Sequence, residues 1–122
     1  LYGNRMFYGC TALTTLDLNL PKITQCVSMF YGCTSLTNVD LNLPDAVACK
    51  NMFEGCATLK NVKLNIIHVM DYTDIFKYCS AIEKINVTVN TLIEDDFKSY
   101  VLGLNLAHLT EFIINGEEVD LS

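Results

Sequence analysis

The chain repeats itself every 23 residues, and this period constrains its fold more than any other feature. Three series keep the spacing: Phe7, Phe30, Phe53 and Phe76; Cys10, Cys33, Cys56 and Cys79; and Leu13, Leu36, Leu59 and Ile82. One unit of this length cannot bury its apolar face alone, so a fixed period in this range predicts stacked units that share one continuous core. We therefore expect a solenoid.

Each unit contains one segment in which apolar and polar residues alternate at every step. These segments are 16–20, 39–43, 62–66 and 85–89. An alternation of period two is typical of a β-strand with one buried face. Because the strand recurs in the same phase of the repeat, the stacked strands should run parallel, with a rung spacing of about 4.8 Å. Pro21 and Pro44 follow the first two strands and should end them, since proline cannot donate to a strand ladder.

The segment that returns from one strand to the next has a different apolar pattern. Cys26, Met29, Phe30 and Cys33 follow the i, i+3, i+4, i+7 spacing, which favours one or two helical turns. Gly32 stands where such a turn must stop, in a position that suits a left-handed cap, and Gly55 repeats it. Tyr78 replaces this glycine in the next unit, which indicates that the array is ending.

After Val89 the period breaks. Residues 93–102 favour a longer helix with three acidic residues in its first turn, where negative charge suits the helix dipole. The strand pattern returns four residues late at 109–114, and Asn115-Gly116 is a strong hairpin signal between 113–114 and Val119. We expect one domain over 1–122, with repeats in 1–92 and a helix and capping hairpin in 93–122.

Composition excludes several classes of function. The formal net charge is −6, and no basic stripe exists that could hold a nucleic-acid backbone. Polar positions interrupt every apolar run, so no segment approaches the roughly 18 apolar residues needed to span a bilayer. We therefore expect that the protein does not bind nucleic acid, does not insert into a membrane and is a monomer. The chain also begins in the middle of a repeat, which we interpret as a piece of a longer array or a processed product.

No catalytic or metal-binding motif stands out. The six cysteines fall at two repeat phases, and we interpret them as buried thiols that act as small hydrophobes. Disulfides between rungs are the alternative, because stacked Cα atoms are close enough, although equivalent side chains point the same way. No Cys-x-x-Cys pair supports zinc. His68 and His108 have no motif around them, and we interpret them as surface histidines. Asn86-Val87-Thr88 matches the N-glycosylation sequon, but it lies in a predicted strand, and we assign it no role. We predict no enzyme activity and no cofactor.

The outward strand positions are the best candidates for a binding site. They form three columns across the predicted sheet: Thr15, Asn38, Asn61 and Lys84, extended by Glu111; Asp17, Asp40, Lys63 and Asn86; and Asn19, Asn42, Asn65 and Thr88. Short polar side chains lose little rotamer freedom on binding. The alternative is a solvated face whose asparagines bond along the stack. Asp17 beside Asp40 places like charges on neighbouring rungs, which a bound calcium ion shared with Asn19 and Asn42 could relieve.

The pattern Met-Phe-x-Gly-Cys-x-x-Leu-x-x-Leu-Asp-Leu resembles the repeats of the BspA-like leucine-rich-repeat family. The resemblance covers residues 5–89 closely and 105–121 loosely, and Pro21 and Pro44 come two residues later than proline does in many members. It implies an α/β leucine-rich-repeat solenoid with a parallel sheet on one face, short helical turns on the other and a capping hairpin. It also implies a bacterial or protozoan surface or secreted scaffold for adhesion and protein binding, with no defined activity.

Two hypotheses for function follow. The first is a protein-binding, adhesin-like module that engages a host or matrix protein through the outward strand face. The second is a structural spacer or capping segment of a larger surface protein, with no binding role of its own.

Overall fold

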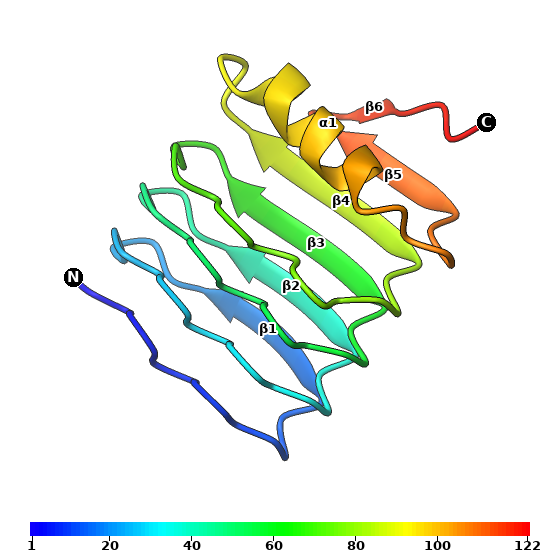
Figure 1. Ribbon diagram of the computed structural model, residues 1–122. Helices are drawn as coiled ribbons and strands as arrows, with labels where there is room; N and C mark the ends of the chain where they lie inside the picture. Colours follow the sequence, from blue (N-terminus) through cyan, green and yellow to red (C-terminus); the bar gives the residue numbers. More distant parts are fainter.

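The computed structural model describes residues 1–122. They form a stack of β-rungs with a helix and a hairpin at its C-terminal end (Figure 1). The sheet has six strands in the order β1-β2-β3-β4-β5-β6. Their bounds are Thr15–Asn19 for β1, Asn38–Asn42 for β2, Asn61–Ile66 for β3, Lys84–Val89 for β4, Glu111–Ile114 for β5 and Glu117–Glu118 for β6. The expected leucine-rich-repeat solenoid is confirmed.

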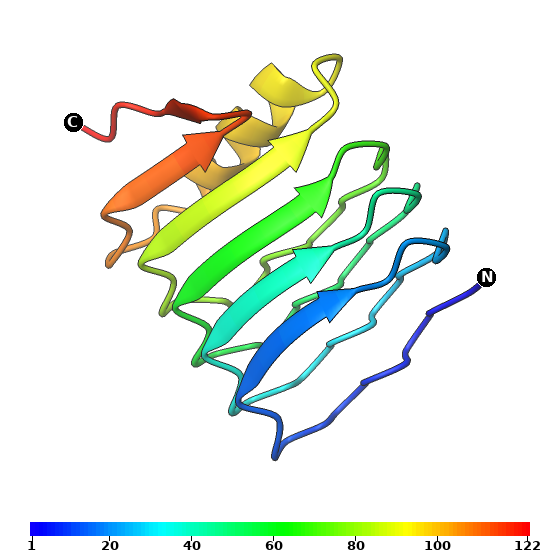
Figure 2. The same cartoon turned by 180° about the vertical axis from the view of Figure 1, so that it is seen from behind.

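The register of the sheet follows the sequence period. Strands β1 to β5 are parallel, and Asp17 pairs with Asp40, which pairs with Lys63 one rung further on. The offset is 23 residues from β1 to β4, and it becomes 27 between Lys84 and Glu111 on β5. Buried and exposed residues alternate along each strand, so one face of the sheet lies on the core and the other lies outward (Figure 2).

The core is a set of side-chain ladders that run along the solenoid. It holds 33 buried apolar residues in one cluster, and no charged or polar side chain is buried. The rings of Phe7, Phe30, Phe53 and Phe76 stack nearly parallel, with centroids 5.2, 5.5 and 6.0 Å apart from one rung to the next. Ring separations of this size are within the range of favourable aromatic pairs. The predicted phenylalanine stack is confirmed.

The return segments contain the predicted turns, but these do not join into a helix. In the segment 26–33, Met29 N–H bonds the carbonyl of Cys26 and Cys33 N–H bonds the carbonyl of Phe30, which are three-residue turns. The intervening N–H groups of Ser28 and Phe30 bond carbonyls of the next rung, at 2.9 Å each. Half of the backbone N–H groups of this segment therefore bond to the neighbouring rung. An α-helix cannot form here, because it would need these N–H groups for its own hydrogen bonds.

Left-handed residues fix these turns. Gly32 and Gly55 have φ of 71° and 79°, as expected for a position that favours glycine. Tyr78 keeps φ at 64° in the next rung, so the backbone turn survives although its glycine does not. Ser28 and its equivalents in other rungs are also left-handed. The return path is thus a string of tight turns held in register with its neighbours.

The C-terminal end has the predicted helix and hairpin. Helix α1 spans Glu94–Gly103, carries three acidic residues in its first turn, and buries Phe97 and Val101 against the last rung. Strands β5 and β6 pair antiparallel around Asn115-Gly116, and Val119 follows β6 with its N–H bonded to the carbonyl of Phe112. In Figure 1, α1 lies in the layer of the return segments, in front of β4 and β5. No helix has the length and apolar content needed to cross a bilayer.

Candidate binding face

The outward side chains of β1 to β5 form the surface that we call the strand face. The three predicted columns are in register: the first runs from Thr15 through Asn38, Asn61 and Lys84 to Glu111; the second through Asp17, Asp40, Lys63 and Asn86; the third through Asn19, Asn42, Asn65 and Thr88. Because a parallel sheet holds equivalent residues about 4.8 Å apart, the side chains of each column lie side by side. The strand face is therefore a regular, rigid grid.

Asparagine amides hydrogen-bond along two of these columns. In the third column Asn42 Nδ2 donates to Asn19 Oδ1 at 2.8 Å, and Asn65 Nδ2 donates to Asn42 Oδ1 at 2.7 Å. In the first column Asn61 Nδ2 donates to Asn38 Oδ1 at 2.7 Å. These bonds hold the amides in fixed orientations and use part of their hydrogen-bonding capacity within the stack. The Asn ladder is thus a structural element as well as a candidate contact surface.

Charge is distributed unevenly over the strand face. Asp17 and Asp40 are neighbours in the second column, and Lys63 follows Asp40 on β3. Lys84 lies one column away on β4, beside Asn61. All four charged side chains are exposed. The face therefore has an acidic part on β1 and β2 and a basic part on β3 and β4.

A shallow hollow of about 420 Å³ lies over this boundary. Its polar lining comes from two columns and consists of Asn38, Asp40, Asn61, Lys63, Lys84, Asn86 and Glu111. Half of the predicted contact residues thus border one concavity. Thr15, Asp17, Asn19, Asn42, Asn65 and Thr88 lie on the same face outside it.

A calcium ion between Asp17 and Asp40, weighed above as a way to relieve their repulsion, would find few free ligands. Asn19 Oδ1 and Asn42 Oδ1 each accept an amide hydrogen bond, so the oxygens that would complete a site with Asp17 and Asp40 are already engaged. Calcium takes six to eight oxygen ligands, and two carboxylates alone fall short of that number. No group of three or more histidine, cysteine or acidic side chains lies close enough to hold a metal ion.

The cysteines form a ladder of free thiols inside the core. All six are free, and five of them are buried. The Sγ atoms of Cys33, Cys56 and Cys79 lie 3.2, 3.2 and 3.0 Å from the carbonyl oxygens of Phe7, Phe30 and Phe53 in the preceding rung. Each thiol therefore donates a weak hydrogen bond to a carbonyl one rung back. This contact explains why a small side chain with a donor recurs at this phase.

Burial keeps these thiols protonated. It raises the pKa of Cys26 and of Cys56 from 9.0 to about 12, and it raises the pKa of Cys49 well above 9.0. A nucleophilic cysteine needs the opposite, a lowered pKa and access to substrate. The cysteine ladder is therefore a packing element.

The two histidines lie on the surface. His68 is exposed and its Nδ1 lies 2.7 Å from the carbonyl oxygen of Pro44, which fixes the ring against the turn below it. The imidazole must carry its proton on Nδ1 to donate this bond, because a carbonyl only accepts. His108 is exposed before β5.

Sequence reasoning placed the columns correctly, with Glu111 at the end of the first, but missed the last residue of the second. Glu111 lines the hollow and Ile113 continues the second column, since it pairs with Asn86. The 27-residue offset hides Ile113 from the 23-residue period. The only available signal was the strand-like pattern Phe112-x-Ile114, which places Ile113 outward by alternation.

The geometry defines a class of protein, a leucine-rich-repeat solenoid with an exposed parallel-strand face. The BspA type leucine-rich repeat region matches residues 2–111 in six copies, and the chain belongs to this family. No curated protein and no solved structure matches the chain.

Membership carries general properties of the family. Leucine-rich-repeat domains are protein-interaction modules, and these solenoids are in general non-enzymatic. Proteins of the BspA type are commonly surface-associated or secreted in bacteria.

Proposed function

We propose that the chain is an adhesin-like recognition module, displayed at a cell surface or secreted, which binds a host or matrix protein through the strand face. The observation that carries this proposal is the register of exposed charges and amides on one rigid sheet, with a hollow at its centre. A rigid face loses little conformational entropy when a partner binds. Polar side chains with fixed orientations supply specificity through hydrogen bonds and charge.

The rest of the molecule supports the choice of this face. The opposite side of the sheet is buried against the core, and the return segments use alternate backbone N–H groups between rungs. A second hollow beside α1 has the carboxylates of Asp71 and Asp96 in its lining but no cationic side chain and no amide. The strand face is where charged side chains, amides and a concavity coincide.

A pull-down tests this proposal. The immobilised protein is exposed to extracts of extracellular matrix and of host-cell surface proteins, beside the Asp17→Lys/Asp40→Lys variant. A control variant, Asp45→Lys/Asp120→Lys, makes the same change in net charge at exposed positions outside the face. We expect a partner that the parent and the control retain and the face variant loses. Circular dichroism melts establish that all three proteins are folded.

The Asn ladder favours a second candidate, a spacer or cap without a binding role. Asparagines that bond to one another stabilise the stack and need no partner to satisfy them. Retention of no partner by any of the three folded proteins would support the spacer and count against the recognition module.

A further inference from the structure

We propose that the strand face recognises an extended peptide segment that carries one basic and one acidic side chain about three residues apart. This inference rests on the proposed function and specifies the chemistry of the partner. The basic side chain would lie over Asp17 and Asp40, and the acidic side chain would lie near Lys63 and Lys84.

The order of charges across the strands carries the inference. From β1 to β4 the outward charges are Asp17, Asp40, Lys63 and Lys84, that is, two negative followed by two positive. Glu111 on β5 follows Lys84 and ends the series with one negative charge. The acidic pair is directly adjacent, and like charges opposite one another on neighbouring strands destabilise a sheet. A basic side chain placed between them would relieve that repulsion. The two lysines are offset by one column, and each lies opposite a carboxylate, Lys63 opposite Asp40 and Lys84 opposite Glu111. An acidic side chain placed beside both lysines would be attracted by them but would relieve no like-charge contact.

The hollow lies where such a segment would cross. Asp40, Lys63 and Lys84 all border it, so it joins the acidic part of the face to the basic part. Asn61 lies opposite Lys84 and Asn86 lies opposite Lys63, and both offer amide groups to a peptide backbone. A segment in the hollow could therefore make two charge contacts and hydrogen-bond to these amides.

The separation of the two charge pairs sets the spacing. Across the strands, the middle of the acidic pair and the middle of the lysine pair are two strand separations apart, about 9.6 Å, and the offset of Lys84 by one column raises the separation to about 10 Å. A polyproline II segment rises about 3.1 Å per residue with three residues per turn, so residues i and i+3 share a side and lie about 9.3 Å apart. An extended segment with opposite charges three residues apart fits this distance.

The size of the face favours a peptide over a second copy of this chain. Two negative strands followed by two positive strands would also complement themselves under a two-fold rotation. Yet five strands of about five residues present only about 400 Å², half of the roughly 800 Å² per partner of a standard interface. A short segment needs no more area than the strand face offers.

The experiment is a titration of three peptides into three forms of the isotope-labelled protein, followed by amide chemical shifts. The peptides are proline-rich twelve-residue sequences with Arg and Glu, two Arg, or two Glu, placed three residues apart. The proteins are the parent, Asp17→Lys/Asp40→Lys and Lys63→Glu/Lys84→Glu. The controls Asp45→Lys/Asp120→Lys and Lys22→Glu/Lys50→Glu match the charge changes outside the face. A fourth peptide has the Arg and Glu adjacent.

We expect the parent to bind the Arg/Glu peptide at least fivefold more tightly than the other three, with shifts confined to β1–β4. The Asp→Lys variant should switch its preference to the two-Glu peptide, and the Lys→Glu variant to the two-Arg peptide. Each matched control should behave as the parent does. If a reversed variant loses its dispersed spectrum, Asp17→Asn/Asp40→Asn replaces it and should weaken the Arg/Glu peptide about two- to fivefold, as removal of exposed ion pairs does.

Several results would overturn the inference. Equal binding of all peptides by the parent would do so, as would shifts outside the strand face or preferences that do not follow the reversed charges. Sedimentation of the parent as a dimer that Asp17→Lys/Asp40→Lys abolishes would make a second copy the occupant instead. Peptides that fail while a pulled-down protein still depends on Asp17 and Asp40 would remove this inference and leave the proposed function standing.

Discussion

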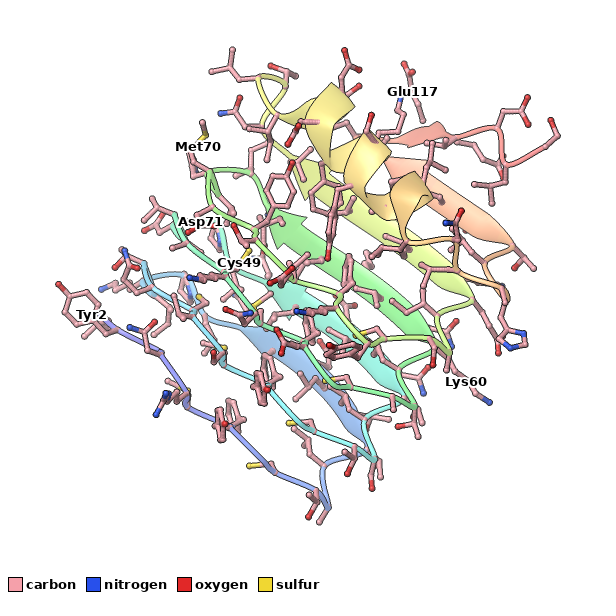
Figure 3. The ribbon with its side chains drawn as sticks, viewed as in Figure 1. Tyr2, Cys49, Lys60, Met70, Asp71 and Glu117 are labelled. Carbon is pink, nitrogen blue, oxygen red and sulfur yellow. The ribbon has the colours of Figure 1, made fainter.

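The hydroxyl oxygen of Tyr100 accepts a hydrogen bond from the backbone N–H of Phe76, at 3.1 Å. In the preceding rungs the equivalent N–H groups, those of Phe30 and Phe53, donate to carbonyls of the next rung at 2.9 and 3.0 Å. A side chain from α1 thus takes the place of the backbone that would otherwise follow. In Figure 3 the helix lies across the end of the stack, where its side chains reach the last return segment.

Removal of this hydroxyl should destabilise the fold. Tyr100→Phe leaves the Phe76 N–H buried without an acceptor, and we expect a loss of about 1–2 kcal/mol in the free energy of unfolding. Urea denaturation followed by circular dichroism measures it. Tyr78→Phe, at an exposed hydroxyl, is the control and should change the stability by less than about 0.5 kcal/mol. Equal stability of both variants would show that the bond contributes nothing.

Phe53 tests the aromatic ladder. Its ring is fully buried between Phe30 and Phe76, so Phe53→Ala should leave a cavity in the middle of the stack and cost about 3–5 kcal/mol. The measurement is the midpoint of thermal or urea unfolding. Phe53→Leu, which keeps most of the volume, should cost less. The stacked core is the wrong description if the alanine variant melts within a degree of the parent.

Asn115 joins three parts of the C-terminal end. Its Oδ1 accepts from Val89 N–H at 2.9 Å, its Nδ2 donates to Glu94 Oε1 at 2.6 Å, and its φ is 50°. Asn115→Gly should lose only the side-chain bonds and cost about 1–2 kcal/mol. Asn115→Ala should cost about 1 kcal/mol more, since alanine resists a left-handed backbone. Urea unfolding of both variants separates the two effects, and equal stability of the pair would exclude the backbone contribution.

Alkaline pH should destabilise the protein through the buried thiols. The unfolded chain releases a thiol proton near pH 9, whereas burial holds the pKa of Cys26 in the folded chain at about 12. The unfolded state then binds fewer protons, so stability falls as pH rises from about 9 towards 12 and is unaffected by this group at neutral pH. Each such thiol contributes a slope of about 1.4 kcal/mol per pH unit.

Cys26→Ala isolates one thiol. Under reducing conditions, the free energy of unfolding of the parent and the variant is measured by urea titration between pH 8 and pH 11. Above pH 9, the free energy of unfolding of the variant should fall less steeply with pH than that of the parent, by about 1.4 kcal/mol per pH unit. Cys10→Ala, at an exposed thiol, is the control and should run parallel to the parent. Parallel curves for Cys26→Ala as well would mean that its pKa is not raised.

The sequence predicted the parts of the fold that obey the period. The columns that contain Asp17 and Asn19 follow from alternation within a strand and a constant offset between strands, and both are local properties of the chain. The phenylalanine stack follows for the same reason. Even the hairpin at Asn115 was predictable, because Asn-Gly has a strong local preference for that turn.

The parts that depend on contacts between unlike segments could not be predicted. No pattern links Tyr100 to Phe76, since a helix residue here replaces a backbone carbonyl. The hollow depends on how the side chains of two columns pack beside one another, which no pattern in the sequence describes, although Glu111 at its border was placed in the first column. The apolar residues of the return segments have a helical spacing, yet half of the N–H groups bond to carbonyls of the next rung. The spacing of apolar residues does not show which acceptor each N–H group will use.

The shared donors of the return segments give the solenoid a direction. Between the residues 26–32 and their neighbours, every backbone–backbone hydrogen bond from one rung to the next runs the same way, with the N–H of the earlier rung on the carbonyl of the later one. Within the return segments, a cut between two such rungs would leave N–H groups on the earlier rung and carbonyls on the later one, whereas around the strands each rung both donates and accepts, as in Thr37 N–H to Thr14 and Leu20 N–H to Asn42. The return segments could re-form these bonds only head to tail. Two identical ends placed against each other would face acceptor with acceptor or donor with donor. This direction of the hydrogen bonds means that a further rung, or a related array, can join the return segments only with its chain running in the same direction.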